Sequence, residues 1–153
     1  MAHDGRVAVY FECMTPSSKP VGTMFDLARD IDVHIESQST ADEAAVAGTT
    51  AGLIGPDQEV TWNARHLGIR FRLTSRVTEF DPPHRFVDEQ IRGPFAEFHH
   101  EHIFTPAGEG SVMVDRVRFT APFGPLGRLA EVLVLSRYLR RLIQERGRHL
   151  AER

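Results

Sequence analysis

The sequence predicts an α+β fold in which a curved antiparallel sheet of about six to seven strands wraps around one long C-terminal helix. Apolar and polar side chains alternate along most of the chain, as is typical of strands, and Gly- and Pro-containing turns separate these segments. After residue 125 the apolar spacing becomes helical. Strands joined by tight turns pair antiparallel. Such a sheet must curl around the last helix to bury its aromatic face.

The first third of the chain predicts one strand, one or two short helices and a second strand. Residues 6–14 alternate and are rich in valine and aromatic residues, which indicates a strand. Pro20 fits a first helical turn, and apolar residues then recur at helical spacing as far as the region 30–37, with room for a second short helix. Residues 44–51 are expected to form the next strand.

The middle of the chain predicts five further strands. Residues 59–66 and 69–80 are expected to form a hairpin that turns at Leu67-Gly68, which places Trp62 opposite Leu73. The other three strands are expected at residues 85–92, 96–106 and 111–120. A helix of about two dozen residues follows the Pro122–Pro125 turn, and at 1.5 Å per residue it is long enough to cross the sheet.

Bulk composition restricts the function classes. The 153 residues fit one domain spanning 1–153, and 41% hydrophobic with 25% charged residues is ordinary for a globular protein. A net charge of -3 gives no reason to expect nucleic acid as a partner. The single cysteine, Cys13, excludes an internal disulfide and a cysteine-based zinc framework. No segment reaches the apolar length of a membrane span, and residues 1–6 lack an apolar signal-like run, so a cytoplasmic location is expected.

The inner face of the predicted sheet carries two acids and two histidines among aromatic residues. Side chains two apart on a strand share a face, so His100 and His102 align with the flanking phenylalanines. The turn lengths place Asp88 opposite His100 and Asp115 opposite His102. Opposed Cβ atoms lie about 5 Å apart, which allows two hydrogen-bonded acid–histidine pairs. An apolar face with such groups is typical of a ligand cavity.

Three interpretations of these pairs remain open. They are satisfied buried polar groups, or polar anchors for a largely apolar ligand, or a general acid/base in which an aspartate orients a histidine. A metal site is not expected, because a strand His-x-His pattern alone is weak evidence for zinc ligation.

Several segments resemble one known superfamily. They are residues 24–30 (MFDLARD), 59–68 (EVTWNARHLG), 80–86 (FDPPHRF), 93–95 (GPF), 98–104 (FHHEHIF), 113–117 (MVDRV) and 122–127 (PFGPLG). With these segments the chain is similar to the SRPBCC superfamily, the START-like or birch-pollen-allergen-like helix-grip proteins. More narrowly, it resembles bacterial proteins of the polyketide cyclase/dehydrase and lipid-transport type.

The resemblance implies a sheet that grips the C-terminal helix around a hydrophobic tunnel. Members of the superfamily bind lipids, sterols, polyketides or plant metabolites, and some act on them. They share no catalytic motif, so the resemblance implies no catalytic residue for this chain. Function has to be argued from the cavity itself.

The sequence therefore favours binding of a small hydrophobic molecule such as a lipid, fatty acyl chain or polyketide. The expected ligand-binding residues are Trp62, Phe71, Leu73, Phe86, Gln90, Phe98, Phe104, Met113, Val117, Phe119, Leu129 and Leu133. One alternative is a polyketide cyclase or dehydratase whose catalytic residues come from His100, His102, Asp88 and Asp115. Another is a protein-interaction module with a vestigial cavity.

No cofactor, nucleic acid or stable membrane insertion is expected, and both monomer and homodimer remain open. His34 and His66 lie near the ends of predicted elements, where exposed or capping positions are expected, with a place at the cavity mouth as the alternative. The arginines between residues 137 and 148 are expected to face water.

Overall fold

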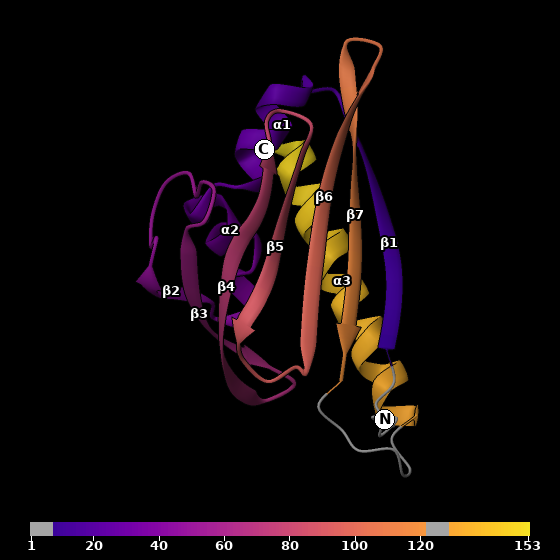
Figure 1. Cartoon of the computed structure of the whole chain (residues 1–153). Coiled ribbons are helices and arrows are strands. Elements are labelled where there is room, and N and C mark those ends of the chain that lie inside the picture. Colours follow the sequence, from indigo (N-terminus) through magenta and orange to yellow (C-terminus); the bar gives the residue numbers. More distant parts are fainter. Residues whose placement is uncertain (1–7, 122–128) are drawn as a thin grey trace, which may run out of the picture.

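A computed structural model describes residues 8–121 and 129–153 of the chain. In this part of the molecule the strands form a seven-stranded antiparallel sheet in the order β1-β7-β6-β5-β4-β3-β2 (Figure 1). The strands are β1 (Ala8–Ser17), β2 (Ala44–Gly48), β3 (Glu59–His66), β4 (Ile69–Asp81), β5 (Arg85–Arg92), β6 (Glu97–Ala107) and β7 (Gly110–Thr120). The helices are α1 (Val21–Ala28), α2 (Ile31–Ser37), the short 3-10 helix η1 (Ser39–Ala41) and α3 (Leu129–Glu152).

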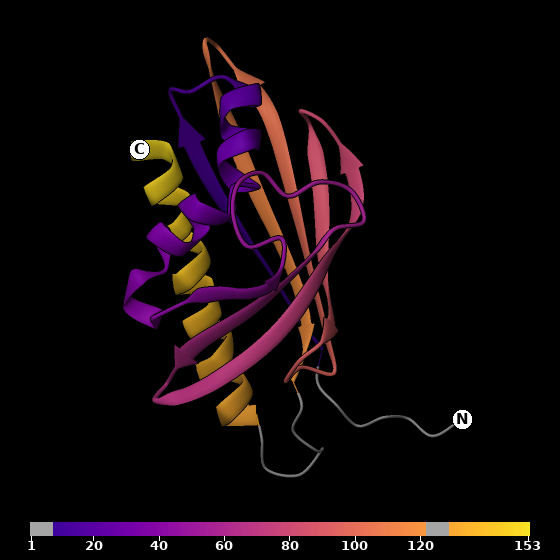
Figure 2. The same ribbon diagram turned by 90° about the vertical axis from the view of Figure 1, so that its left-hand side faces the viewer.

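The sheet curves around α3, and α1 and α2 lie toward one end of the same concave side (Figure 2). This arrangement is the helix-grip fold, so the predicted fold class is confirmed. The Pro122–Gly127 segment that contributed to the resemblance lies outside the described residues. No helix in the described ranges is both long and apolar enough to cross a membrane.

Strand pairing follows the register expected from the turn lengths. Trp62 pairs with Leu73, Asp88 with His100, and His102 with Asp115. The strand boundaries differ most from the expected ones in the N-terminal part of the chain. The first strand extends to Ser17, and β2 ends at Gly48, where the backbone takes a positive φ of 74°.

The segment before β2 contains two separate α-helices, α1 and α2, because the backbone leaves the helical region at Asp30. The Asp30 Oδ1 atom accepts hydrogen bonds from the backbone N–H groups of Asp32 and Val33, at 2.9 Å and 3.2 Å. This side chain caps α2 and starts the helix in a new direction. The break gives α1 and α2 separate contacts on the concave side of the sheet.

Apolar packing divides into three clusters around the concave face. α1 packs on β5, β6 and β7 through Phe25 and Phe104, and α3 packs on β1 and β7 through Val132 and Phe119. The third cluster joins α2 to β3 and β4 through Ile31 and neighbouring residues. Residues from all three clusters line the site described next.

Candidate functional site

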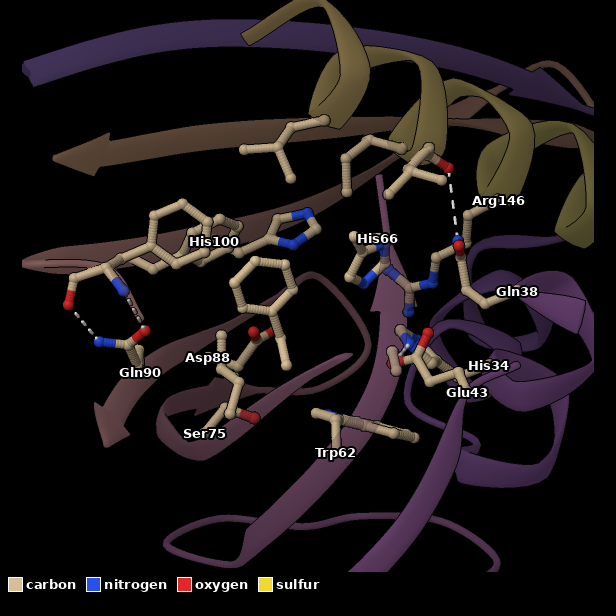
Figure 3. Close-up of a pocket in the computed structure, with 18 of the residues that line it drawn as sticks. His34, Gln38, Glu43, Trp62, His66, Ser75, Asp88, Gln90, His100 and Arg146 are labelled. Atoms are coloured by element: carbon tan, nitrogen blue, oxygen red, sulfur yellow. Dashed lines mark hydrogen bonds and ion pairs between the residues drawn. The ribbon is translucent and has the colours of Figure 1, made fainter. Parts of the chain in front are cut away.

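A cavity of about 790 Å³ lies between the inner faces of β3 to β6 and the helices α2 and α3. The surface of its wall is predominantly apolar, and polar or charged side chains form the minority of its lining (Figure 3). A volume of this size with a mostly apolar surface is typical of sites for small organic ligands. The curved sheet therefore encloses a hollow and not a fully packed core.

Half of the expected ligand-binding residues lie on the cavity wall. They are Trp62, Phe71, Leu73, Phe86, Gln90 and Phe98. The Gln90 amide is already used within the fold, because its Nε2 donates to the Phe95 carbonyl at 2.9 Å and its Oε1 accepts from the Phe95 N–H at 3.2 Å. Gln90 therefore fixes the turn between β5 and β6 and is a poor anchor for a ligand.

Five of the other expected wall residues lie elsewhere in the structure. Phe104 and Met113 are covered by α1, and Val117 and Phe119 are covered by α3, so these four inner-face side chains belong to the dry core. Leu133 is 52% exposed, because it lies on the side of α3 that faces away from the sheet. For Leu129 the wall assignment stays a prediction, since its side chain is outside the described residues.

The four acid and histidine side chains form one network, but their partners differ from the expected ones. His100 Nε2 lies 2.8 Å from Asp115 Oδ1, and His102 Nε2 lies 2.6 Å from Asp88 Oδ2. Both hydrogen bonds run diagonally across the strand pairs, not between directly opposed residues. His102 Nδ1 is 3.2 Å from Asp115 Oδ1, close enough for an ion pair but outside hydrogen-bond alignment. The two imidazole rings stack with centroids 3.9 Å apart.

The network holds both carboxyl groups ionised. Burial alone would raise the pKa of Asp88, but the hydrogen bond with His102 lowers that pKa to about 2. Burial acts in the same direction on Asp115, and the hydrogen bond with His100 together with the close contact with His102 holds its pKa far below the usual range. Ionised carboxylates only accept hydrogen bonds, so the facing nitrogens, His100 Nε2 and His102 Nε2, each carry a proton.

The pKa values of the two histidines are shifted in opposite directions. Burial lowers the pKa of His100, and the neighbouring His102 lowers it further. Burial also opposes protonation of His102, yet its contacts with Asp115 and Asp88 raise its pKa above the usual value. The network therefore favours the charged form of His102, which lies between two carboxylates, and the neutral form of His100.

Only two members of the network reach the cavity. Asp88, whose side chain is 28% exposed, and His100 line the wall, whereas His102 and Asp115 are each 1% exposed and lie behind them. Because His100 Nε2 is held by Asp115, its Nδ1 is the nitrogen free to accept a proton or a hydrogen bond. The network can thus orient one neutral imidazole toward a bound molecule.

A second group of polar side chains borders the cavity near α2 and α3, and we call it the second polar cluster. It consists of His34, Gln38, Glu43, His66, Tyr138 and Arg146. His34 Nε2 lies 3.1 Å from Glu43 Oε1, and the His34 ring stacks on Trp62 at 4.3 Å. His66 Nδ1 lies 2.8 Å from the Tyr138 hydroxyl, which joins the end of β3 to α3.

Sequence reasoning missed this cluster, although part of it was visible in the residue spacing. His66 continues the inner-face series of Trp62 and Ala64 at two-residue intervals. Arg146 follows Leu139, Leu142 and Ile143 at helical spacing and is therefore on the buried side of α3, so the expectation that it faces water is wrong. Gln38 and Glu43 come from irregular segments, for which no periodic signal exists.

Comparisons with known proteins agree with this architecture. Residues 20–153 match the model of the family described as polyketide cyclase / dehydrase and lipid transport. A comparison with curated protein sequences gives no significant match. Among solved structures, TTHA0849 from Thermus thermophilus has 19% sequence identity and a TM-score of 0.74, with 95% of each chain covered.

Two further solved structures share the fold. The di-domain ARO/CYC StfQ from the steffimycin biosynthetic pathway has 20% identity and a TM-score of 0.77 over 95% of this chain and 50% of StfQ. Ara h 8.0201 has 15% identity and a TM-score of 0.63 over 94% of this chain and 99% of its own. At these identities the similarity shows the fold alone.

Proposed function

Because the chain belongs to the polyketide cyclase / dehydrase and lipid transport family, we propose that it binds a small, largely apolar molecule in the cavity. The observation that carries this proposal is the hollow of about 790 Å³ with its predominantly apolar wall. An apolar cavity of this size is costly to keep unfilled, because its lining forgoes packing contacts. A bound apolar molecule would supply those contacts.

The cavity also has a route to the surface. Leu67 and Ile69, at the tip of the β3–β4 hairpin, and Val134 on α3 all line the cavity and are all more than 50% exposed. Large apolar side chains that are both exposed and on the cavity wall mark its opening. A ligand could pass between the hairpin and α3 without unfolding of the sheet.

The proposal is tested with the neutral fluorescent probe N-phenyl-1-naphthylamine and a variant that fills the cavity. Ala64 is a buried wall residue on β3, so Ala64→Trp is expected to weaken probe binding at least about 10-fold by occupying the space. Fluorescence titration measures the change, and Leu73→Trp on β4 repeats the test from the neighbouring strand.

Ala107→Trp is the matched control, because Ala107 is exposed at the far end of β6. It should bind the probe as the unmodified protein does. Undiminished probe binding by folded Ala64→Trp and Leu73→Trp proteins would place the probe outside the cavity and contradict the proposal.

A second candidate function, a polyketide cyclase or dehydratase, is favoured by the orientation of His100. Its Nδ1 is available at the wall while Nε2 is held by Asp115 at 2.8 Å, as a general base requires. Such a base would take a proton from the carbon next to a carbonyl and return it to a departing hydroxyl, releasing water.

His100→Ala separates catalysis from binding. If the second candidate holds, turnover of a poly-β-ketone substrate falls by about 100-fold or more, while the affinity for N-phenyl-1-naphthylamine changes little. Product formation followed by chromatography measures the difference. Equal turnover by the variant, or none by the unmodified protein, removes this candidate and leaves the binding proposal in place.

A further inference from the structure

Arg146 is a buried cation on the cavity wall. It lies on α3 and is 6% exposed. Its Nη2 donates a hydrogen bond to the Ala28 carbonyl, and its Nε is buried without any hydrogen-bond partner. Among the residues that the structure describes, no carboxylate forms an ion pair with it. Arg146 therefore brings a guanidinium to the cavity wall, and the fold leaves one of its donors unused.

Such an arrangement is unfavourable for the protein alone. A buried charge is normally paired, and a buried N–H without an acceptor loses its hydration with no compensating bond. The position follows Leu139, Leu142 and Ile143 on the inner side of α3, where an apolar residue would pack without this penalty. Apolar packing alone therefore does not account for an arginine here.

The nearest acids on the cavity wall are already engaged with histidines. Glu43 lies 3.1 Å from His34, and Asp88 lies 2.6 Å from His102. Burial raises the pKa of each carboxyl and its histidine partner lowers it, and the charge of Arg146 adds a smaller lowering. Arg146 therefore attracts both carboxylates without forming an ion pair with either among the described residues. A molecule in the cavity is a further source of a directly bonded carboxylate.

We propose that Arg146 binds the carboxylate of a ligand whose apolar body fills the rest of the cavity, which makes the ligand a hydrophobic carboxylic acid. This inference rests on the proposed binding function and adds the chemical class of the ligand. A guanidinium offers a planar set of N–H donors that matches a carboxylate. A head group with two negative charges is disfavoured, because Glu43 and Asp88 border the same cavity and would repel it.

The position of Arg146 also fixes the direction of the ligand. Figure 3 shows Arg146 with Gln38 and His34 on one side of the pocket, and His100 with Gln90 on the other. A carboxylate held at Arg146 leaves the apolar body to extend across the aromatic wall toward His100. The acid head group and the acid–histidine network would then contact different parts of one molecule.

Dansyl-labelled undecanoic acid and its methyl ester provide a matched pair of probes. They share the same apolar body and differ in the charge that Arg146 would recognise. At neutral pH the unmodified protein is expected to bind the acid about 10- to 100-fold more tightly than the ester, as a charge-assisted hydrogen bond predicts. Arg146→Gln should remove this preference by weakening the binding of the acid and leaving the binding of the ester unchanged. Fluorescence titration of both proteins with both probes gives the four dissociation constants.

Arg148→Gln is the control, because Arg148 is exposed on the same helix and the change in charge is identical. It should keep the preference for the acid. Equal affinities of the unmodified protein for acid and ester overturn the inference, and this result does not depend on the folding of any variant. Arg146→Lys, which keeps the charge, should retain part of the preference.

Failure of the inference and failure of the proposed function give different results. If both the acid and the ester bind equally well, the cavity takes apolar molecules and only the role of Arg146 is wrong. If neither of them binds and N-phenyl-1-naphthylamine does not bind either, the proposed function fails and the inference fails with it.

Discussion

Replacing Asp115 with alanine is expected to lower the free energy of unfolding by about 3–5 kcal/mol, because it breaks a buried charge network from one side only. Asp115 is 1% exposed, accepts a hydrogen bond from His100 at 2.8 Å and lies 3.2 Å from His102. Without it, the His100 N–H has no acceptor and His102 keeps a single carboxylate partner, Asp88. Urea denaturation at neutral pH measures the loss.

Two comparisons make this expectation specific. Glu97→Ala breaks the 2.8 Å ion pair with Arg118 on the exposed face of the sheet, where both side chains are 52% exposed, so it should cost less than about 1 kcal/mol. The effect of Asp115→Ala should also shrink in acid. A carboxylate with a lowered native pKa stabilises the fold above its unfolded-state value, near 3.9, and loses this contribution as the pH falls through the native value. If Asp115→Ala lowers the free energy of unfolding no more than Glu97→Ala does, the buried charge network does not stabilise the fold as described.

Phe104→Ala is expected to cost about 3–5 kcal/mol, whereas Phe71→Ala should cost much less. Phe104 is 2% exposed and packs edge-to-face on Phe25, with ring centroids 5.4 Å apart. Its removal opens a new cavity in close-packed core. Phe71 lies on the wall of a hollow that already exists, so its truncation removes fewer packing contacts. Urea denaturation of the two variants measures the difference.

The ligand-binding experiment supplies the control for this pair. Phe71→Ala should change the affinity for N-phenyl-1-naphthylamine, and Phe104→Ala, while still folded, should not. Similar stability losses for the two variants would mean that the space beside Phe71 is filled in the native protein, which contradicts the cavity.

The sheet could be predicted from sequence because its signals are local. Alternation gives the face of each side chain, and the turn at Leu67-Gly68 sets the pairing of Trp62 with Leu73. The same alternation could not distinguish side chains on the cavity wall from side chains in the closed core. Phe98 and Phe104 lie on the same face of β6 and differ only in the elements that cover them. The cover comes from helices far away in the chain, whose placement has no periodic signature.

In the acid–histidine network, the sequence predicted the strand pairing but not the hydrogen-bond partners. The strand register placed His102 opposite Asp115, and that pairing is confirmed. Side chains lean along their strand, however, so His102 reaches Asp88 and His100 reaches Asp115. The second polar cluster depends on tertiary contacts between β3, α2 and α3, and among its members the spacing of Arg146 and His66 held the clearest signal in the sequence.

Methyl NMR spectra with and without N-phenyl-1-naphthylamine test most directly whether the hollow between β3–β6 and α3 binds an apolar molecule. The account predicts that the probe shifts the methyl resonances of Ala64, Leu139 and Ile143, which line the cavity, and leaves Val117 in the dry core nearly unchanged. Shifts confined to surface methyl groups such as those of Leu133, with Ala64 and Leu139 unaffected, would contradict it.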